Sequence, residues 1–237
     1  SSIDLRTKLP VEWQHSLDSE PGAFSDLAFD TGLYLVFDAL SELTDDPQYT
    51  EKVDEIYQWY LDNGISDNML GYWGGHTFID LKTLKPFHAV PNPNTHEFKN
   101  TFFYFDPFYR LNTEKAYKMG MHIWLGHVYD WNTLITNRHA YYTKVHDESN
   151  WENLGSFSED YKIIITRGEQ PFRSMASDLV HTAGQMYAQT GDEKAKAWAM
   201  RILKCYYELA DPETGIMPTV YTTARGAAGT LDPMESL

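Results

Sequence analysis

The segment 137–142 holds the densest group of side chains able to do acid–base chemistry, namely Asn137, Arg138, His139, Tyr141 and Tyr142. β-Elimination at a uronate needs a cation or amide to neutralise the carboxylate, a base to remove the C5 proton, and an acid to protonate the leaving O4 oxygen. Asn or Arg suits the first role, His or Tyr the second, and Tyr the third. We therefore expect Asn137, Arg138, His139 and Tyr142 to be catalytic and Tyr141 to bind substrate. The structural alternative is a polar turn whose Arg138 pairs with a surface carboxylate.

A second polar group, HEFKN, begins at His96. If a helix begins here, His96 and Asn100 are neighbours on its surface, because they are four residues apart. A helix N-terminus explains an acidic residue such as Glu97 in its first turn, but it does not explain His96. We predict a catalytic role for His96 and substrate contacts for Glu97, Lys99 and Asn100. The base is then either His96 or His139.

A third group lies in the stretch WGGHTFIDLK, which begins at Trp73. Its two glycines allow the backbone to approach a ligand closely. An aromatic ring such as Trp73 can stack on a sugar, and His76, Asp80 and Lys82 alternate along a strand-like segment. We predict that Trp73, His76 and Lys82 bind substrate. The alternative is a packed loop in which Asp80 acts as a cap and Lys82 is solvated.

Other histidines and the usual cofactor motifs give weaker signals. His122 lies among apolar residues of a predicted helix and is expected to be a core histidine, whereas His127 and Asp130 at the helix end fit either a structural or a functional role. No HExxH motif, cysteine-based metal spacing, phosphate-binding glycine loop or GxSxG motif is present. We therefore predict no cofactor, with a structural or catalytic divalent metal left open.

Composition narrows the class of partner. The formal net charge is −15, and no basic stripe is present, so a nucleic-acid partner is excluded. Local cations are nevertheless enriched in the aromatic middle of the chain, as an acidic-sugar site requires: Lys82, Lys85, Lys99, Arg110 and Arg138. No apolar run approaches membrane-spanning length. The expected partner is an acidic polysaccharide or oligosaccharide, with no nucleic acid and no membrane.

Apolar periodicity predicts two helical hairpins that flank these groups. The first comprises a helix over 27–43 and another over 47–63, and the second comprises helices over 175–187 and 195–207. Residues 97–131 also show helical spacing. The long segments 71–95 and 137–172 are predicted to be loops with short strands at TFIDL and YKIIIT.

The two hairpins resemble each other without gaps when residues 43–71 are aligned with residues 189–217. Turn residues and apolar positions coincide, which is typical of a stacked or closed array of helical hairpins. We therefore predict an all-α fold, an (α/α)n toroid or incomplete barrel whose long loops carry short strands. The chain is expected to form a single domain over residues 1–237, as a fragment of a longer toroid.

Several motifs together resemble bacterial α/α-toroid polysaccharide lyases over about residues 25–225: WGGHTFIDLKT, HEFKN, WLGHVYDWNT, NRHAYY and SDLVHTAGQMYAQTGDEKAKAWAMRI. The most similar family is polysaccharide lyase family 38, which contains alginate and glucuronan lyases, and more loosely the chain resembles pectate lyases. The resemblance implies a periplasmic or secreted bacterial enzyme. It implies that a His and a Tyr move the protons, at His96 or His139 and at Tyr142 or Tyr141. The carboxylate neutraliser is then Asn137 or Arg138.

The resulting prediction is a polysaccharide lyase that cleaves an alginate, glucuronan or pectate type of uronate polymer. A glycoside hydrolase is the first alternative, and it needs two carboxylates that Glu97, Asp80 or Asp130 would supply. A sugar isomerase of the N-acylglucosamine 2-epimerase type, with paired histidines, is the second. A glycan-binding module without catalysis is the third.

Overall fold

The computed structural model describes residues 2–3, 10–11, 24–74, 77–88, 95–98, 103–131, 134–153 and 173–216. The chain divides into two compact units. Unit 1 contains residues 1–97, 101–119 and 141–144, and unit 2 contains residues 98–100, 120–140 and 145–237. The single toroid domain expected from the sequence stays a prediction.

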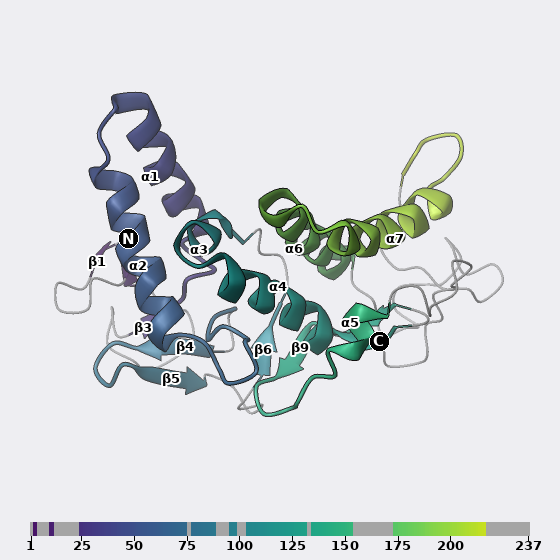
Figure 1. The fold of residues 1–237 in the computed structure, drawn as a ribbon, viewed down its shortest axis with the longest axis horizontal. Coiled ribbons are helices and arrows are strands. Elements are labelled where there is room, and N and C mark those ends of the chain that lie inside the picture. Colours follow the sequence, from purple (N-terminus) through teal and green to yellow (C-terminus); the bar gives the residue numbers. More distant parts are fainter. Residues whose placement is uncertain are drawn as a thin grey trace. The chain divides into compact units, whose positions relative to one another are not determined.

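Helices make up most of the regular structure in the described residues, in agreement with the predicted class. Helices α1 (Thr31–Thr44) and α2 (Gln48–Asn63) form one hairpin, and α6 (Arg173–Thr190) and α7 (Glu193–Leu209) form the other (Figure 1). Both predicted hairpins are confirmed. The remaining helices are α3 (Asp106–Leu111), α4 (Thr113–His127) and α5 (Ser149–Glu152). Among the described residues, none of the helices combines the length and apolar character needed to cross a membrane.

The turns inside the two hairpins have the same geometry. The hydroxyl of Thr44 donates to the carbonyl oxygen four residues before it at 2.6 Å, and that of Thr190 does so at 2.5 Å. The next residue is left-handed in both, with φ of 55° at Asp45 and 73° at Gly191. A left-handed residue at this position ends a helix and frees the chain to reverse.

The similarity continues into the following helices. The carboxylates of Asp46 and Asp192 each accept a hydrogen bond from the backbone N–H two residues later, at 3.1 Å in both. After the second helix of each hairpin, Met69 and Gly215 are again left-handed, with φ of 59° and 70°. The internal repeat predicted from the sequence is therefore confirmed as shared turn geometry in two separate units.

Short strands accompany the helices. In unit 1, β3 (Phe24–Ser25), β4 (Thr77–Asp80) and β5 (Lys85–His88) form an antiparallel sheet in that order, which confirms the strand predicted at TFIDL. Strands β1 (Ser2–Ile3) and β2 (Pro10–Val11) pair with each other, as do β7 (Val128–Asp130) and β8 (Ile135–Thr136). Strand β9 spans His139–Tyr141. The strand predicted at YKIIIT lies outside the described residues.

The sequence prediction fails at β6 (Thr95–Glu97), where a helix was expected to begin. All three residues are buried, and the carbonyl oxygen of Thr95 accepts a hydrogen bond from the hydroxyl of Thr77 at 3.1 Å. Tertiary contacts thus hold an extended backbone in a segment whose local sequence suits a helix start. Helical spacing is confirmed only further along the segment 97–131, in α3 and α4.

Four tryptophans form the core of unit 2. The rings of Trp131 and Trp198 are 4.8 Å apart, and those of Trp124 and Trp151 are 5.6 Å apart. The indole N–H of Trp198 donates to the carbonyl oxygen of Trp151 at 3.1 Å, and that of Trp124 donates to Leu179 at 3.0 Å. Burial of large rings whose polar atoms are satisfied ties α4, α5, α6 and α7 together.

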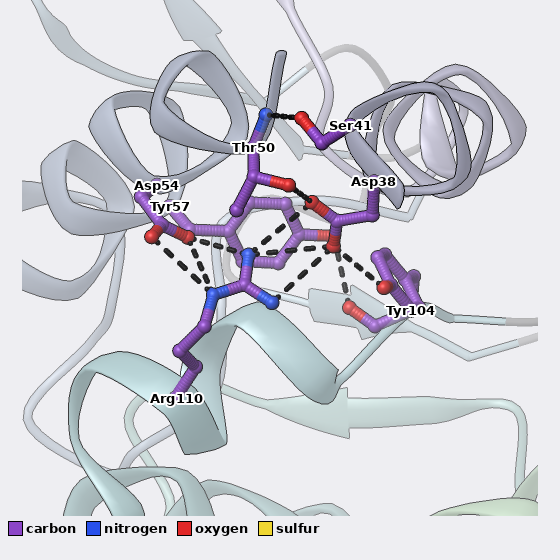
Figure 2. Close-up of polar contacts among 7 residues, drawn as sticks. All are labelled: Asp38, Ser41, Thr50, Asp54, Tyr57, Tyr104 and Arg110. Carbon is purple, nitrogen blue, oxygen red and sulfur yellow. Dashed lines mark hydrogen bonds and ion pairs between the residues drawn. The ribbon is translucent and has the colours of Figure 1, made fainter. Parts of the chain in front are cut away.

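A polar network fastens α1, α2 and α3 in unit 1. Figure 2 shows the Arg110 side chain extending from α3 between two carboxylates, those of Asp54 on α2 and Asp38 on α1. The closest approaches are 2.6 Å to Asp54 and 3.3 Å to Asp38. Asp38 also accepts hydrogen bonds from the hydroxyls of Thr50 at 2.7 Å and Tyr104 at 2.6 Å. Burial and the nearby Asp38 carboxylate raise the pKa of Tyr104, so its hydroxyl remains a donor.

We predict that Asp38→Ala lowers the free energy of unfolding by about 2–3 kcal/mol, because two hydroxyls and a guanidinium lose their shared acceptor. The matched control is Asp54→Ala, which removes only the more exposed partner of Arg110 and should cost less than about 1 kcal/mol. Urea denaturation gives both values from the midpoint and slope. Equal losses in the two variants would contradict the central place of Asp38.

Candidate functional site

The glycine-containing loop of unit 1 is held by a buried carboxylate. Gly74 has φ of 107°, and a Cβ at this position would lie 2.1 Å from the carbonyl oxygen of Glu97, so only glycine fits. The carboxylate of Asp26 accepts hydrogen bonds from the backbone N–H of Gly74 at 3.0 Å and of Ala28 at 2.9 Å. The sequence analysis did not predict a role for Asp26. Its only signal in the sequence is an acidic side chain within the otherwise largely apolar segment AFSDLAF.

Tyr142 contacts the same loop. Its hydroxyl donates to the carbonyl oxygen of Gly71 at 3.0 Å, and the side-chain amide of Asn68 donates to its backbone carbonyl. Only 7% of Tyr142 is exposed, and burial raises the pKa of its hydroxyl. The expected role of Tyr142 as a proton donor stays a prediction, and it would require the hydroxyl to leave the Gly71 carbonyl.

Trp73 and His96 lie beside Tyr142 in the interior of unit 1. The His96 ring is 6.2 Å from that of Trp73 and 6.1 Å from that of Tyr142. Trp73 stacks on Phe103 at 4.9 Å and is 2% exposed, and His96 is 0% exposed. The structure thus brings together three residues predicted from three separate motifs. It places Trp73 in the core, whereas the sequence predicted an accessible ring for a sugar.

His88 is a partly exposed histidine that sequence reasoning did not single out. Its Nδ1 lies 3.0 Å from the hydroxyl of Thr77, which itself donates to the carbonyl oxygen of Thr95. With the single hydrogen of that hydroxyl directed at Thr95, Nδ1 of His88 is the donor and the lone pair of the neutral ring lies on Nε2. Burial lowers the pKa of His88 and favours this neutral form.

The predicted group Asn137, Arg138 and His139 lies in unit 2, between β8 and β9. The side-chain oxygen of Asn137 accepts a hydrogen bond from the backbone N–H of His139 at 2.9 Å. The carbonyl oxygen of Arg138 accepts one from the backbone N–H of Phe98 at 2.8 Å. The backbone of the segment is therefore held, and the side chains of Arg138 and His139 remain partly exposed. A cation next in sequence to a histidine suits recognition of a carboxylate and proton transfer beside it.

Other predicted residues take different positions. Lys82 is exposed in the turn after β4, where its backbone N–H donates to the Asp80 carboxylate at 2.7 Å. Tyr141 is 46% exposed, and Glu97 is buried on β6. Three predicted substrate-binding residues lie outside the described part of the chain: His76, Lys99 and Asn100. The site roles of these residues all stay predictions.

The histidines of the α4 region are buried. His122 lies with its Nδ1 3.1 Å from Nδ1 of His146, which confirms it as a core histidine. His127 contacts the backbone of Asn137. Within the described ranges, no three His, Cys, Asp or Glu side chains are grouped as a metal site. Because His76 lies outside those ranges, the expectation of no cofactor, with a divalent metal left open, stays a prediction.

Comparison with known proteins gives the family. The family model described as periplasmic pectate lyase matches residues 1–228. A pectate disaccharide-lyase of Dickeya dadantii (strain 3937) is 27% identical over 228 residues, which are 90% of this chain and 40% of that relative. The chain therefore spans about two fifths of the length of this curated relative. The matching family is not the family 38 suggested by the motifs, but it is a polysaccharide lyase family described as periplasmic, as the sequence predicted. The match over residues 1–228 shows that the chain belongs to the family of periplasmic pectate lyases.

Proposed function

We propose that the protein cleaves pectate, a polymer of galacturonate, by β-elimination. The observation that carries the proposal is the family match over nearly the whole chain. The name of the Dickeya relative, pectate disaccharide-lyase, supports the same substrate and a disaccharide product. Pectate takes precedence over alginate and glucuronan, the other predicted uronates, because the family description and this relative both specify pectate.

We propose that Arg138 and His139 act on the uronate. Arg138 is favoured over Asn137 as the carboxylate partner because the side-chain oxygen of Asn137 is committed to the N–H of His139. His139 is partly exposed as a residue, with its Nε2 atom covered, whereas all of His96 is buried. His139 is favoured because less of the protein must move for a polymer to reach it. The two residues follow each other in a segment whose backbone is held by hydrogen bonds.

The fold proposal follows from the repeated hairpin. Two hairpins with the same turn geometry, separated along the chain by further helices, fit an α/α toroid made of such hairpins. In a toroid the helices form the wall, and the irregular segments between them carry the chemistry. Residues 137–138, between β8 and β9, and the loop 71–74 are both of this irregular kind.

The first prediction about function concerns the reaction. Incubation with polygalacturonate should raise the ultraviolet absorbance characteristic of a C4–C5 unsaturated uronate, because β-elimination forms that double bond. Polymannuronate, polyguluronate and glucuronan serve as comparison substrates, and parallel samples contain either EDTA or an added divalent cation to reveal any dependence on metal. A flat trace on all four substrates from a folded protein would contradict the proposal. Release of reducing ends without absorbance would then favour a hydrolase, and interconversion of sugars would favour an isomerase.

The second prediction concerns the two residues. Arg138→Gln and His139→Gln should each lower kcat/KM on polygalacturonate by about 10³-fold, because each removes a group that stabilises the transition state or moves a proton. Lys118→Gln on the exposed face of α4 is the matched control for loss of a cation and should leave turnover unchanged. Wild-type activity in both Arg138→Gln and His139→Gln would exclude these residues from the site.

The third prediction uses pH to identify the base. If His139 is the base, kcat/KM should rise with pH as the imidazole loses its proton and then level off, because a neutral imidazole accepts the proton. A profile that continues to rise above about pH 9 would contradict a histidine base and indicate a group with a higher pKa, such as a tyrosine or an arginine.

A further inference from the structure

His127, the last residue of α4, is bonded to the candidate segment in two directions. The backbone N–H of Asn137 donates to the carbonyl oxygen of His127 at 2.8 Å. The Nδ1 atom of His127 lies 2.7 Å from the carbonyl oxygen of Asn137. Because a carbonyl oxygen only accepts, Nδ1 must carry the hydrogen, which sets the tautomer of the ring. One residue thus satisfies both backbone groups of Asn137.

The environment of His127 keeps this donor in place over a wide pH range. The residue is 0% exposed, and burial lowers its pKa to about 3. The nearby His139 and His146 act in the same direction, whereas the hydrogen bond to Asn137 opposes them. The ring is therefore neutral at ordinary pH, and the Nδ1–H donor does not depend on protonation.

The contacts of His127 extend to the rest of the segment. Its ring lies 5.3 Å from that of Phe98, whose backbone N–H donates to the carbonyl oxygen of Arg138. Asn137 in turn accepts from the backbone N–H of His139. All three residues of the segment 137–139 therefore have a backbone hydrogen bond. Asn137 bonds to His127, and Arg138 bonds to Phe98, which packs on His127. His139 bonds to the side chain of Asn137. The backbone of the segment thus has little freedom to turn the Cα–Cβ bonds of Arg138 and His139 away.

We propose that His127 is a positioning residue that fixes the directions in which Arg138 and His139 project. The inference rests on the proposed function of those two side chains, and it assigns His127 no contact with substrate. A small rotation of a catalytic group lowers the rate by a large factor, so loss of the hydrogen bond from Nδ1 should lower kcat. His122 on the same helix provides the contrast, because its ring contacts His146 and Glu148 instead.

A pair of amide variants tests the position of the donor. In His127→Asn the amide nitrogen falls near the place of Nδ1 and can still reach the Asn137 carbonyl, whereas in His127→Gln it falls near the place of Nε2. We expect His127→Gln to lower kcat by about 10²-fold with little change in KM, and His127→Asn to recover most of the loss. Circular dichroism and the urea midpoint show whether each variant is folded. His122→Asn is the control for a polar substitution at a buried histidine of α4 and should retain kcat.

A second readout is independent of activity. In the wild-type protein, ¹⁵N NMR of the imidazole rings should show His127 as the neutral Nδ1-protonated tautomer from about pH 5 to pH 8. A titrating ring or the Nε2-protonated tautomer would overturn the inference directly. Equal kcat values for His127→Asn and His127→Gln in an active protein would also overturn it, while the proposed function would stand. A wild-type protein inactive on every uronate would contradict the proposed function. The tautomer of His127 would still show whether its Nδ1 donates to the carbonyl oxygen of Asn137.

Discussion

The hydrogen bond between the ring of His127 and the carbonyl oxygen of Asn137 is the contact on which the candidate site of unit 2 depends. Irregular segments of a helical protein leave backbone N–H and C=O groups without partners from secondary structure, and buried groups of this kind must be satisfied in another way. In the segment 137–139 the partners are a buried ring, a neighbouring backbone N–H and an amide side chain. All of these contacts involve the backbone of the segment, and Arg138 and His139 are partly exposed as residues.

The loop of unit 1 follows the same rule with other residues. The carboxylate of Asp26 accepts from the N–H of Gly74, and the hydroxyl of Tyr142 donates to the carbonyl of Gly71. Both side chains are buried and come from segments distant in sequence. Asp26 and Tyr142 are of residue types common in catalysis, but in this structure both are hydrogen-bonding partners of the backbone. Whether Tyr142 also moves a proton depends on its ability to leave Gly71.

Local features were predictable from the sequence, and long-range ones were not. Apolar periodicity located both hairpins, and the alignment of residues 43–71 with 189–217 anticipated left-handed residues at equivalent turns. The same local reasoning placed a helix start at Thr95–Glu97, where contacts with Thr77 hold a strand. It gave Trp73 an accessible ring, but stacking on Phe103 buries that ring. Asp26 and His88 were missed because their partners lie about 48 and 11 residues away, beyond any short motif.

A titration followed by NMR tests the central claim, that the segment 137–139 contacts the uronate. Trigalacturonate is added to the wild-type protein while the side-chain N–H signal of Arg138 and the ring signals of His139 are followed. The account predicts that these signals shift together and saturate, whereas those of Lys118 on the exposed face of α4 do not move. Saturable binding that shifts other signals and leaves Arg138 and His139 unchanged would contradict it.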